Sequence, residues 1–288
     1  MEYLTSKESW LKFVNSLKIT EEITDKETAK KVLYESIIKA LKSKIKPSTG
    51  ILFSGGVDST LVAYLSKKLG YDLKCYSLGF KDSDDIEYAR KIAKEYNLNY
   101  KEKIITIEEL ESAIKQVIKI LKTSDFVKIS IGSLVYLACK EAKKDKIKIL
   151  LTGSGTEDTL LGYDKHKKAF LNNTLKEETL NGLLSFHDRD LSRDIPIASS
   201  LGIKLDSPYL DETYIRTAMK ISNKLKINNN HKKLILRELA LSLGLKEEFA
   251  FRKKRAAQYG SKIEREIGRL ARINGFKYKE GYLKSLLK

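Results

Sequence analysis

Short apolar runs alternate with amphipathic stretches over the first half of the chain. Four stretches are expected to be strands, namely residues 51–53, 73–80, 100–106 and 147–152, and the first is an apolar run typical of a short buried strand. Between them, apolar residues recur every three or four positions, which is typical of helices that bury one face. We expect such helices over residues 57–69, 86–96, 108–121 and about 130–143. Strands that alternate with helices predict an α/β fold with a doubly wound parallel sheet.

The two ends of the chain carry helical patterns. Near the N-terminus, Trp10 with Phe13 and Leu33 with Ile37 mark two amphipathic segments. Beyond about residue 160 we expect no further strand, because helical periodicity dominates over residues 178–186, 195–201, 212–221, 231–243 and 262–273. The pattern predicts three parts: an N-terminal helical segment (1–46), an α/β core (47–165) and a mostly helical C-terminal part (166–288) that completes the ligand site.

Composition is that of a globular protein without a membrane span. The chain has 288 residues, of which 42% are hydrophobic, enough for a sizeable core. No apolar stretch approaches the roughly 18 residues of a membrane span, and the N-terminus lacks the apolar core of a signal peptide. Cys75 and Cys139 form neither a CxxC pair nor a disulfide framework, and the three histidines are too scattered for a zinc site. We therefore expect a cytoplasmic protein with no membrane partner.

The charge balance is strongly basic. The chain carries 55 Lys and Arg against 38 Asp and Glu, for a net charge of +17. This excess fits an RNA or DNA partner, and it equally fits the Lys/Glu-rich surface of a heat-adapted protein. The densest cluster is Arg252-Lys253-Lys254-Arg255. A nucleic acid, an acidic protein or a nucleotide would each account for that cluster, so these alternatives stay open.

The first apolar run leads into a glycine turn from which the next helix starts. The turn reads Ser54-Gly55-Gly56-Val57-Asp58-Ser59. A helix N-terminus offers unpaired N–H groups and a partial positive charge, and Gly55 and Gly56 let the backbone approach an anion. The hydroxyls of Ser54, Ser59 and Thr60 add donors. The pattern predicts a phosphate-binding loop of a type other than Walker A, because no lysine follows Gly56.

Carboxylates follow both this turn and a second one. Asp58 would repel phosphate unless a Mg²⁺ ion lay between them, and Mg²⁺ prefers oxygen ligands. The last strand runs into Thr152-Gly153-Ser154-Gly155, which is followed by Glu157 and Asp158. Either acidic residue is a candidate second Mg²⁺ ligand facing Asp58; the alternative is that both stabilise a helix N-terminus. Ligands of open α/β sheets bind at the carboxyl ends of strands, where these turns lie.

The first turn resembles the S-G-G-x-D-S loop of the N-type ATP pyrophosphatases, the PP-loop family. The order of the motifs resembles the synthetase domain of asparagine synthetase and of its relative, β-lactam synthetase. The matching pieces extend over about residues 50 to 260 and comprise 54–59, 78–79, 124–138, 151–163, 190–211 (with Pro208-Tyr209-Leu210-Asp211), 231–238 and 251–260. The resemblance implies the adenine nucleotide alpha-hydrolase-like fold, with ATP and Mg²⁺ as cofactors.

The resemblance also implies roles for individual residues. Asp58 and Glu157 match magnesium ligands, although the family has aspartate at the second position. Lys254 matches a lysine that contacts the phosphates during adenylation, with a solvated basic surface as the alternative. Asp190 and Arg193 match an Asp/Arg pair in the pocket wall, and the alternative for Arg193 is a surface salt bridge. The adenosine would be lined by Leu52, Leu78, Gly79, Thr152 and Gly153, and the pyrophosphate held by Ser54, Gly55, Gly56, Ser59 and Thr60.

The implied activity is that of an AMP-forming ligase. ATP would adenylate a carboxylate, or an amide oxygen, with pyrophosphate leaving; ammonia or an amine would then displace AMP. The amidotransferase members begin with a glutaminase domain whose nucleophile is an N-terminal cysteine, whereas Glu2 follows Met1 here. We therefore expect free ammonia, an amine, or ammonia from a separate subunit as the nitrogen source.

A second departure concerns the acceptor. Ser154 stands where asparagine synthetase carries a glutamate, so we expect either a different acceptor or a nucleophile that is deprotonated by another group, with Glu157 or Asp158 as the nearest candidates. One alternative function is a PP-loop enzyme that modifies tRNA, which the net charge favours. Another is a protein that binds adenine nucleotides without catalysis.

Overall fold

The structure is a computed structural model of the chain, and it describes residues 6–17, 21–253 and 256–287. The chain divides into two compact units. The first, here the helical unit, consists of Met1–Ile45, Thr152–Leu191 and Asp206–Arg252. The second, the sheet unit, consists of Lys46–Leu151, Ser192–Leu205 and Lys253–Lys288. The boundaries at residues 46 and 165 that the sequence suggested remain a prediction.

A parallel sheet forms the centre of the sheet unit. Its strands are β1 (Thr49–Leu52), β2 (Lys74–Gly79), β3 (Tyr100–Ile104), β4 (Ile149–Leu151) and β5 (Lys204–Asp206), in the order β3-β2-β1-β4-β5. The central strand β1 pairs in parallel with both β2 and β4, and β2 pairs in parallel with β3. At the edge, the Lys204 N–H donates to the Lys148 carbonyl at 2.8 Å.

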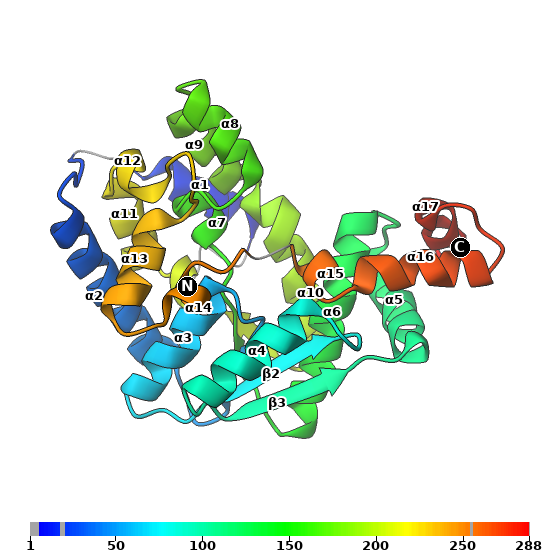
Figure 1. Cartoon of the computed structure of the whole chain (residues 1–288). Coiled ribbons are helices and arrows are strands. Elements are labelled where there is room, and N and C mark those ends of the chain that lie inside the picture. Colours follow the sequence, from blue (N-terminus) through cyan, green and yellow to red (C-terminus); the bar gives the residue numbers. More distant parts are fainter. Residues whose placement is uncertain (1–5, 18–20, 254–255, 288) are drawn as a thin grey trace. The chain divides into compact units, whose positions relative to one another are not determined.

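The strand order places a topological switch beside β1. The chain proceeds from β1 to β2 and β3, and then returns to β4 on the other side of β1. The first two crossovers contain α3 (Val57–Lys68) and α4 (Asp84–Glu95), and the returning one contains α5 (Ile107–Leu121) and α6 (Phe126–Lys144). Right-handed crossovers in opposite directions put these two helix pairs on opposite faces, and Figure 1 shows α4 in front of β2 and β3. The doubly wound parallel sheet is therefore confirmed.

The apolar pattern accounts for the packing around the sheet. Tyr76 and Leu78 of β2 are buried in one core cluster with Leu110 of α5 and Ile129 of α6. The remaining helices of this unit are α10 (Ser192–Ser200), α15 (Ala257–Gly260), α16 (Ile263–Ile273) and α17 (Lys279–Ser285). The apolar face of α16 is buried in the same cluster, through residues such as Ile267.

The helical unit collects short helices from three stretches of the chain. They are α1 (Lys7–Asn15), α2 (Lys26–Lys44), α7 (Thr156–Thr159), α8 (Asp164–Leu171), α9 (Leu175–Phe186), the π-helical turn η2 (His187–Leu191), the 3₁₀ turn η3 (Pro208–Leu210), α11 (Glu212–Lys220), α12 (Asn223–Lys226), α13 (Leu234–Ser242) and α14 (Glu247–Ala250). The indole N–H of Trp10, fully buried on α1, donates to the Leu183 carbonyl at 2.6 Å. A buried ion pair between Lys44 and Asp206, at 2.6 Å, ties α2 to the start of the third stretch.

Most of the predicted elements are present, but one expectation was wrong. The predicted strands are confirmed within a few residues, and the two N-terminal helices are present as α1 and α2. The expectation of no strand beyond about residue 160 was wrong, because β5 lies there. This edge strand is three residues long, and Leu205 is its one apolar member, so it gives no periodic signal.

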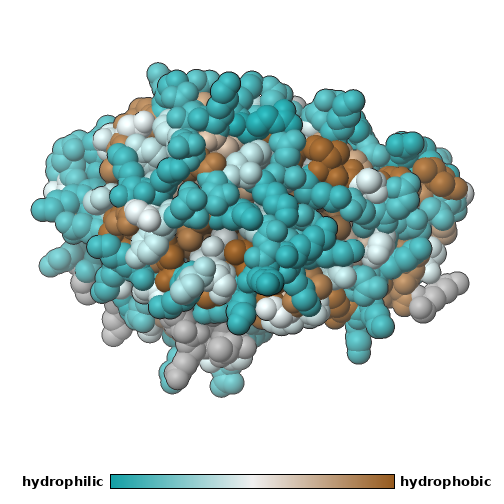
Figure 2. Space-filling view, turned by 90° about the horizontal axis from the view of Figure 1, so that it is seen from below, coloured by the Kyte–Doolittle hydropathy of each residue, from teal (hydrophilic) through white to brown (hydrophobic). Residues whose placement is uncertain are grey.

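Hydrophilic side chains dominate the face of the molecule that is seen from below (Figure 2). Figure 2 shows one face on which hydrophobic residues form small, separate groups among them. Some basic residues pair with acidic ones one helical turn away, as Lys91 does with Glu87 and Arg216 with Glu212. Among the described residues, no helix is long and apolar enough to cross a membrane. The cytoplasmic location remains a prediction.

Candidate functional site

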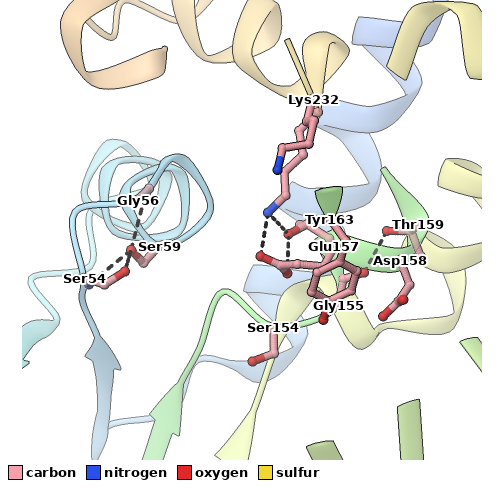
Figure 3. A network of polar contacts seen from close by, with 12 residues as sticks. Ser54, Gly56, Ser59, Ser154, Gly155, Glu157, Asp158, Thr159, Tyr163 and Lys232 are labelled. Carbon is pink, nitrogen blue, oxygen red and sulfur yellow. Dashed lines mark hydrogen bonds and ion pairs between the residues drawn. The ribbon is translucent and has the colours of Figure 1, made fainter. Parts of the chain in front are cut away.

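The phosphate-loop motif connects β1 to α3 in the sheet unit. Gly55 adopts φ +66°, a left-handed conformation that glycine tolerates best, and Gly56 is the residue that precedes α3. The Ser59 hydroxyl donates to the Gly56 carbonyl at 3.2 Å and accepts from the Ser54 N–H at 3.3 Å (Figure 3). The loop is thus closed on itself at the N-terminus of a 12-residue helix, the geometry that favours an anion.

The polar residues of the first turn of α3 are buried. Asp58 is 5% exposed, and Thr60 is fully buried. The Thr60 hydroxyl has no hydrogen-bond partner among the described residues. A carboxylate at this depth requires a cation or several donors to offset its desolvation. The donor chemistry at Asp58, a carboxylate beside a phosphate-type loop, suits Mg²⁺.

The candidate adenosine residues of the sheet unit lie at the same edge of the sheet. Leu52 ends β1, and Leu78 and Gly79 end the neighbouring strand β2. Leu78 is 5% exposed, and the Gly79 carbonyl accepts from the Ile105 N–H at 2.9 Å. A Cβ at Gly79 would collide with the Ser83 hydroxyl, so the backbone there needs glycine. The structure therefore brings these residues and the phosphate loop to one carboxyl edge.

The second glycine turn belongs to the helical unit, where the stretch after Asp206 holds it. The Thr152 N–H donates to the Asp206 carbonyl at 2.8 Å, and the Ser207 hydroxyl donates to the Ser154 carbonyl at 2.7 Å. Gly155 has φ +110°, and a Cβ there would lie 2.9 Å from the Tyr209 carbonyl oxygen. The turn formed by residues 152–155 thus packs against the segment Ser207-Pro208-Tyr209-Leu210.

Glu157, the candidate metal ligand of α7, is held by a lysine. Lys233 Nζ lies 2.8 Å from Glu157 Oε1 and 2.9 Å from the Thr156 hydroxyl, and that hydroxyl is 3.1 Å from Glu157 Oε2. The Lys233 side chain is 7% exposed, and its backbone has φ +54°. A Cβ at Gly162 would collide with the Lys233 side chain, so the glycine makes room for it. The carboxylate is therefore neutralised within the helical unit.

Asp158 faces the opposite way and is paired with an arginine. Figure 3 shows the carboxylates of Glu157 and Asp158 pointing away from one another. Asp158 is fully buried, and its Oδ2 accepts from Arg189 Nη2 at 2.6 Å. Burial raises the pKa of Asp158, and the charge of Arg189 opposes that shift. Arg189 Nε also donates to Asp190 at 2.7 Å, so one guanidinium joins two carboxylates.

The predicted Asp/Arg pair lies in different units. Asp190 is in η2 of the helical unit, where Arg189 contacts it. Arg193 is in α10 of the sheet unit, is 5% exposed, and donates from Nε and Nη2 to Asp194 at 2.6 and 2.8 Å. Arg193 thus forms a salt bridge, as the alternative expected, but the side chain is buried rather than at the surface. The pairing of Asp190 with Arg193 remains a prediction.

Lys254 lies outside the described residues, but the described segment that follows it contacts residues just after β2. The Phe80 N–H, just after β2, donates to the Ser261 carbonyl at 3.0 Å. A Cβ at Gly260 would lie 2.5 Å from Asp85 Oδ2 at the start of α4. The stretch after Lys254 therefore returns to the carboxyl end of β2.

Two site residues, Lys233 and Arg189, were missed by sequence reasoning. Lys233 lies in a matching piece, but its neighbour Lys232 is chemically identical and pairs instead with the 93%-exposed Asp164. Arg189 adjoins the predicted Asp190, yet its contact with Asp158 spans 31 positions. Among the described residues, no cluster of three or more His, Cys, Asp or Glu forms a ready-made metal site. Mg²⁺ does not need one, since one or two carboxylates and substrate phosphates suffice.

The chain has a phosphate-binding type of loop at the switch point of a doubly wound sheet. A second glycine turn with carboxylates follows later in the chain. These two features are typical of one class of α/β nucleotide-binding proteins. Within that class, the chain belongs to the asparagine synthase family. The family model "Asparagine synthase" matches residues 28–180 and 171–275. This confirms the resemblance predicted from the sequence. Asparagine synthetases are ATP-dependent ligases that form C–N bonds.

Two curated relatives illustrate the match. A protein of Methanocaldococcus jannaschii named "Putative asparagine synthetase 1 (glutamine-hydrolyzing)" is 32% identical over 289 residues, which cover 88% of this chain and 53% of the relative. Asparagine synthetase B of Escherichia coli is 29% identical over 236 residues, which cover 76% of this chain and 42% of the relative. The chain thus spans about half the length of the curated relatives it matches.

Solved structures give weaker matches. NMN synthetase from Francisella tularensis is 14% identical with a TM-score of 0.37, covering 73% of this chain and 100% of that chain. A predicted subunit of tRNA methyltransferase from M. jannaschii is 17% identical with a TM-score of 0.32, covering 72% of this chain and 93% of that chain. Neither TM-score is high enough to support an argument about function.

Proposed function

We propose that this chain is an ATP-dependent, AMP-forming ligase of the asparagine synthetase type. A carboxylate oxygen, or an amide oxygen, attacks the α-phosphorus of ATP, and the bond to pyrophosphate breaks. The nitrogen of ammonia or an amine then attacks the activated carbon, loses a proton, and displaces AMP. The observation that carries the proposal is the closed Ser54–Ser59 loop at the end of the central strand, in a chain of this family.

The residues of this chain supply binding and orientation. The backbone of Gly55 and Gly56, with the hydroxyls of Ser54 and Ser59, holds the leaving pyrophosphate at the N-terminus of α3. The ends of β1 and β2, at Leu52, Leu78 and Gly79, line the adenosine, together with Thr152 and Gly153. Holding nucleotide and acceptor together lowers the entropic part of the barrier. Thr60 is too deeply buried to share in binding without a local rearrangement.

Asp58 and Glu157 are the proposed ligands of Mg²⁺. Support comes from their positions after the adjacent strands β1 and β4, paired in register at Ile51 and Leu151, and from the family resemblance. When bound, Mg²⁺ supplies charge neutralisation on the phosphates. Until then, Lys233 compensates the charge of Glu157.

Lys254, Asp190 and Arg193 are proposed to act on the reacting groups. Lys254 neutralises charge that develops on the α-phosphate, which a point charge does well. Asp190 and Arg193 form part of the acceptor pocket wall. The acceptor is a small carboxylate or amide, and the nitrogen comes from ammonia, an amine, or a separate ammonia-supplying subunit.

A pyrophosphate-release screen tests the proposal. Purified protein is incubated with ATP, Mg²⁺ and ammonium across a panel of amino acids and other small carboxylates. An acceptor-dependent release of pyrophosphate supports the ligase. ATP binding without any release across the panel favours the non-catalytic alternative.

The net charge of +17 favours one second candidate, a PP-loop enzyme that acts on tRNA. Charge attraction alone gives binding that falls steeply with salt. A tRNA substrate should in addition stimulate pyrophosphate release. Binding that disappears at moderate salt without that stimulation would leave the small-molecule ligase as the better proposal.

A further inference from the structure

Arg189 joins two parts of the helical unit that carry candidate site residues. Its Nη2 atom lies 2.6 Å from Oδ2 of Asp158, which is the residue after Glu157 on α7. Its Nε atom lies 2.7 Å from Oδ2 of Asp190 in the π-helical turn η2. A planar guanidinium presents donors on two edges in a fixed geometry, which the single nitrogen of a lysine does not reproduce. Local π-helical turns are frequent at functional sites.

Aromatic rings fix the plane of this guanidinium. The guanidinium carbon Cζ of Arg189 lies 5.1 Å from the ring centre of Tyr163 and 5.6 Å from that of Phe186. Phe186 in turn lies 5.4 Å from the indole of Trp10, which α1 buries completely. Three rings and one guanidinium therefore form a continuous series of contacts from α1 to Tyr163, the residue before α8. The N-terminal helix at which this series begins precedes the part of the chain that the family model matches.

The helix that carries Glu157 depends on such contacts. α7 has four residues, too few to be stable by its own hydrogen bonds. The Asp158 carboxylate is buried, and its Oδ1 has no partner among the described residues. A Cβ at Gly182 would collide with that oxygen, so α9 leaves it little freedom to move. Removing Arg189 would leave a buried, uncompensated charge, which forces α7 to shift.

We propose that Arg189 is a positioning residue: by holding Asp158 and Asp190 together, it sets α7, and with it Glu157, in place to receive the metal–nucleotide complex. This inference rests on the proposed function, because it concerns the metal ligand of that site. Arg189 touches neither substrate nor metal in the proposal. Its effect passes through Asp158 to Glu157.

The test measures metal binding rather than turnover. Mn²⁺ is titrated into the full-length protein with a non-hydrolysable ATP analogue, and free Mn²⁺ is followed by electron paramagnetic resonance. We expect Arg189→Met to weaken Mn²⁺ binding about 10-fold or more, the usual effect of losing a group that orients a metal ligand. Arg189→Lys should stay impaired, because a single ammonium does not reproduce the fixed planar spacing of the guanidinium donors.

Arg216 provides the matched control. It lies in the same unit, stacks on the Phe13 ring at 5.5 Å, and pairs with Glu212 at 2.8 Å. Arg216→Met should bind Mn²⁺ like the wild type. The double variant Asp158→Asn/Arg189→Met removes the buried charge together with its partner, so it should recover thermal stability without recovering Mn²⁺ affinity.

Three results decide the matter. Wild-type Mn²⁺ affinity in Arg189→Met, or in the double variant, would overturn the positioning role and leave Arg189 a merely structural residue. Wild-type protein that binds Mn²⁺ with the analogue but never releases pyrophosphate would defeat the proposed ligase, while the variants still decide the role of Arg189. Wild-type protein that binds no Mn²⁺ with the analogue would contradict both proposals.

Discussion

The Nζ atom of Lys233 lies 2.8 Å from Oε1 of Glu157, so the candidate metal ligand is already paired with a buried cation. Lys233 reaches this position from a backbone in the left-handed region, φ +54°, at the residue before α13. The pair is confined to the helical unit and therefore contributes to the stability of the nucleotide-free protein.

Replacing Lys233 by methionine should destabilise the protein. The change leaves Glu157, whose side chain is 29% exposed, without its cation, so we expect a loss of about 1–3 kcal/mol in the free energy of unfolding. Urea denaturation at pH 7 measures it. Lys232→Met is the matched control, because Lys232 pairs with the exposed Asp164 and should lose less than about 1 kcal/mol. Equal losses in the two variants would show that the buried pair stabilises the fold no more than the exposed pair does.

A second prediction concerns Lys226, which is 1% exposed. Burial lowers its pKa from 10.5 to about 7, and the charge of Glu22 opposes this in part. Between these pH values the unfolded chain binds more protons than the folded one, so this group makes stability rise with pH. The loss of stability caused by burying this charged lysine is complete below about pH 7, and it disappears as the pH rises towards 10.5.

Lys226→Met should therefore stabilise the protein most at pH 6 and progressively less at higher pH. Free energies of unfolding at pH 6, 8 and 9.5 measure the difference. Lys224→Met, at another lysine of the short helix α12, is the control and should show little change with pH. A stabilisation by Lys226→Met that is the same at every pH would mean that Lys226 stays protonated throughout.

Local motifs were predictable from the sequence because local residues create them. The glycine turn and the start of the helix around Ser54–Ser59 need contacts between residues at most five positions apart, such as that of Ser59 with Ser54. Strands β1 and β4 were predictable because buried parallel strands are nearly continuous apolar runs. Both features arise from steric and hydrophobic preferences that act over a few residues.

The remaining site features arise from distant contacts. Lys233 meets Glu157 across 76 positions, and nothing in the local sequence separates it from Lys232. Arg189 sits in a π-helical turn, which has no recognisable local pattern, and its partner Asp158 resembles any acidic residue at a helix start. The three-residue strand β5 exists because Lys204 hydrogen-bonds at the sheet edge, not because its sequence favours a strand.

Lys254 should be much more sensitive to substitution than its neighbour. If Lys254 stabilises charge on the α-phosphate, Lys254→Ala should reduce pyrophosphate release about 10²-fold or more, the range for losing one such group. Lys253→Ala should do much less. Equal effects of the two substitutions would indicate a general basic surface, such as one that contacts nucleic acid.

The serine at position 154 should make the protein a poor asparagine synthetase. A general base must take up a proton near the working pH, and a hydroxyl cannot do so. With aspartate, ammonium, ATP and Mg²⁺, we expect asparagine at a rate well below about 1 s⁻¹, the lower end of typical enzyme turnover. Ser154→Glu should raise that rate. Rapid asparagine formation by the wild type would show that position 154 does not select the acceptor.

The central claim is that ATP is cleaved between its α- and β-phosphates with the help of Asp58. The most direct measurement separates the nucleotide products of an ATP and Mg²⁺ incubation with the acceptor panel, for the wild type and for Asp58→Asn. We predict AMP and pyrophosphate in equal amounts from the wild type, and at least about 10²-fold less from a folded Asp58→Asn protein. ADP and phosphate as the main products, or undiminished AMP formation by Asp58→Asn, would contradict the account.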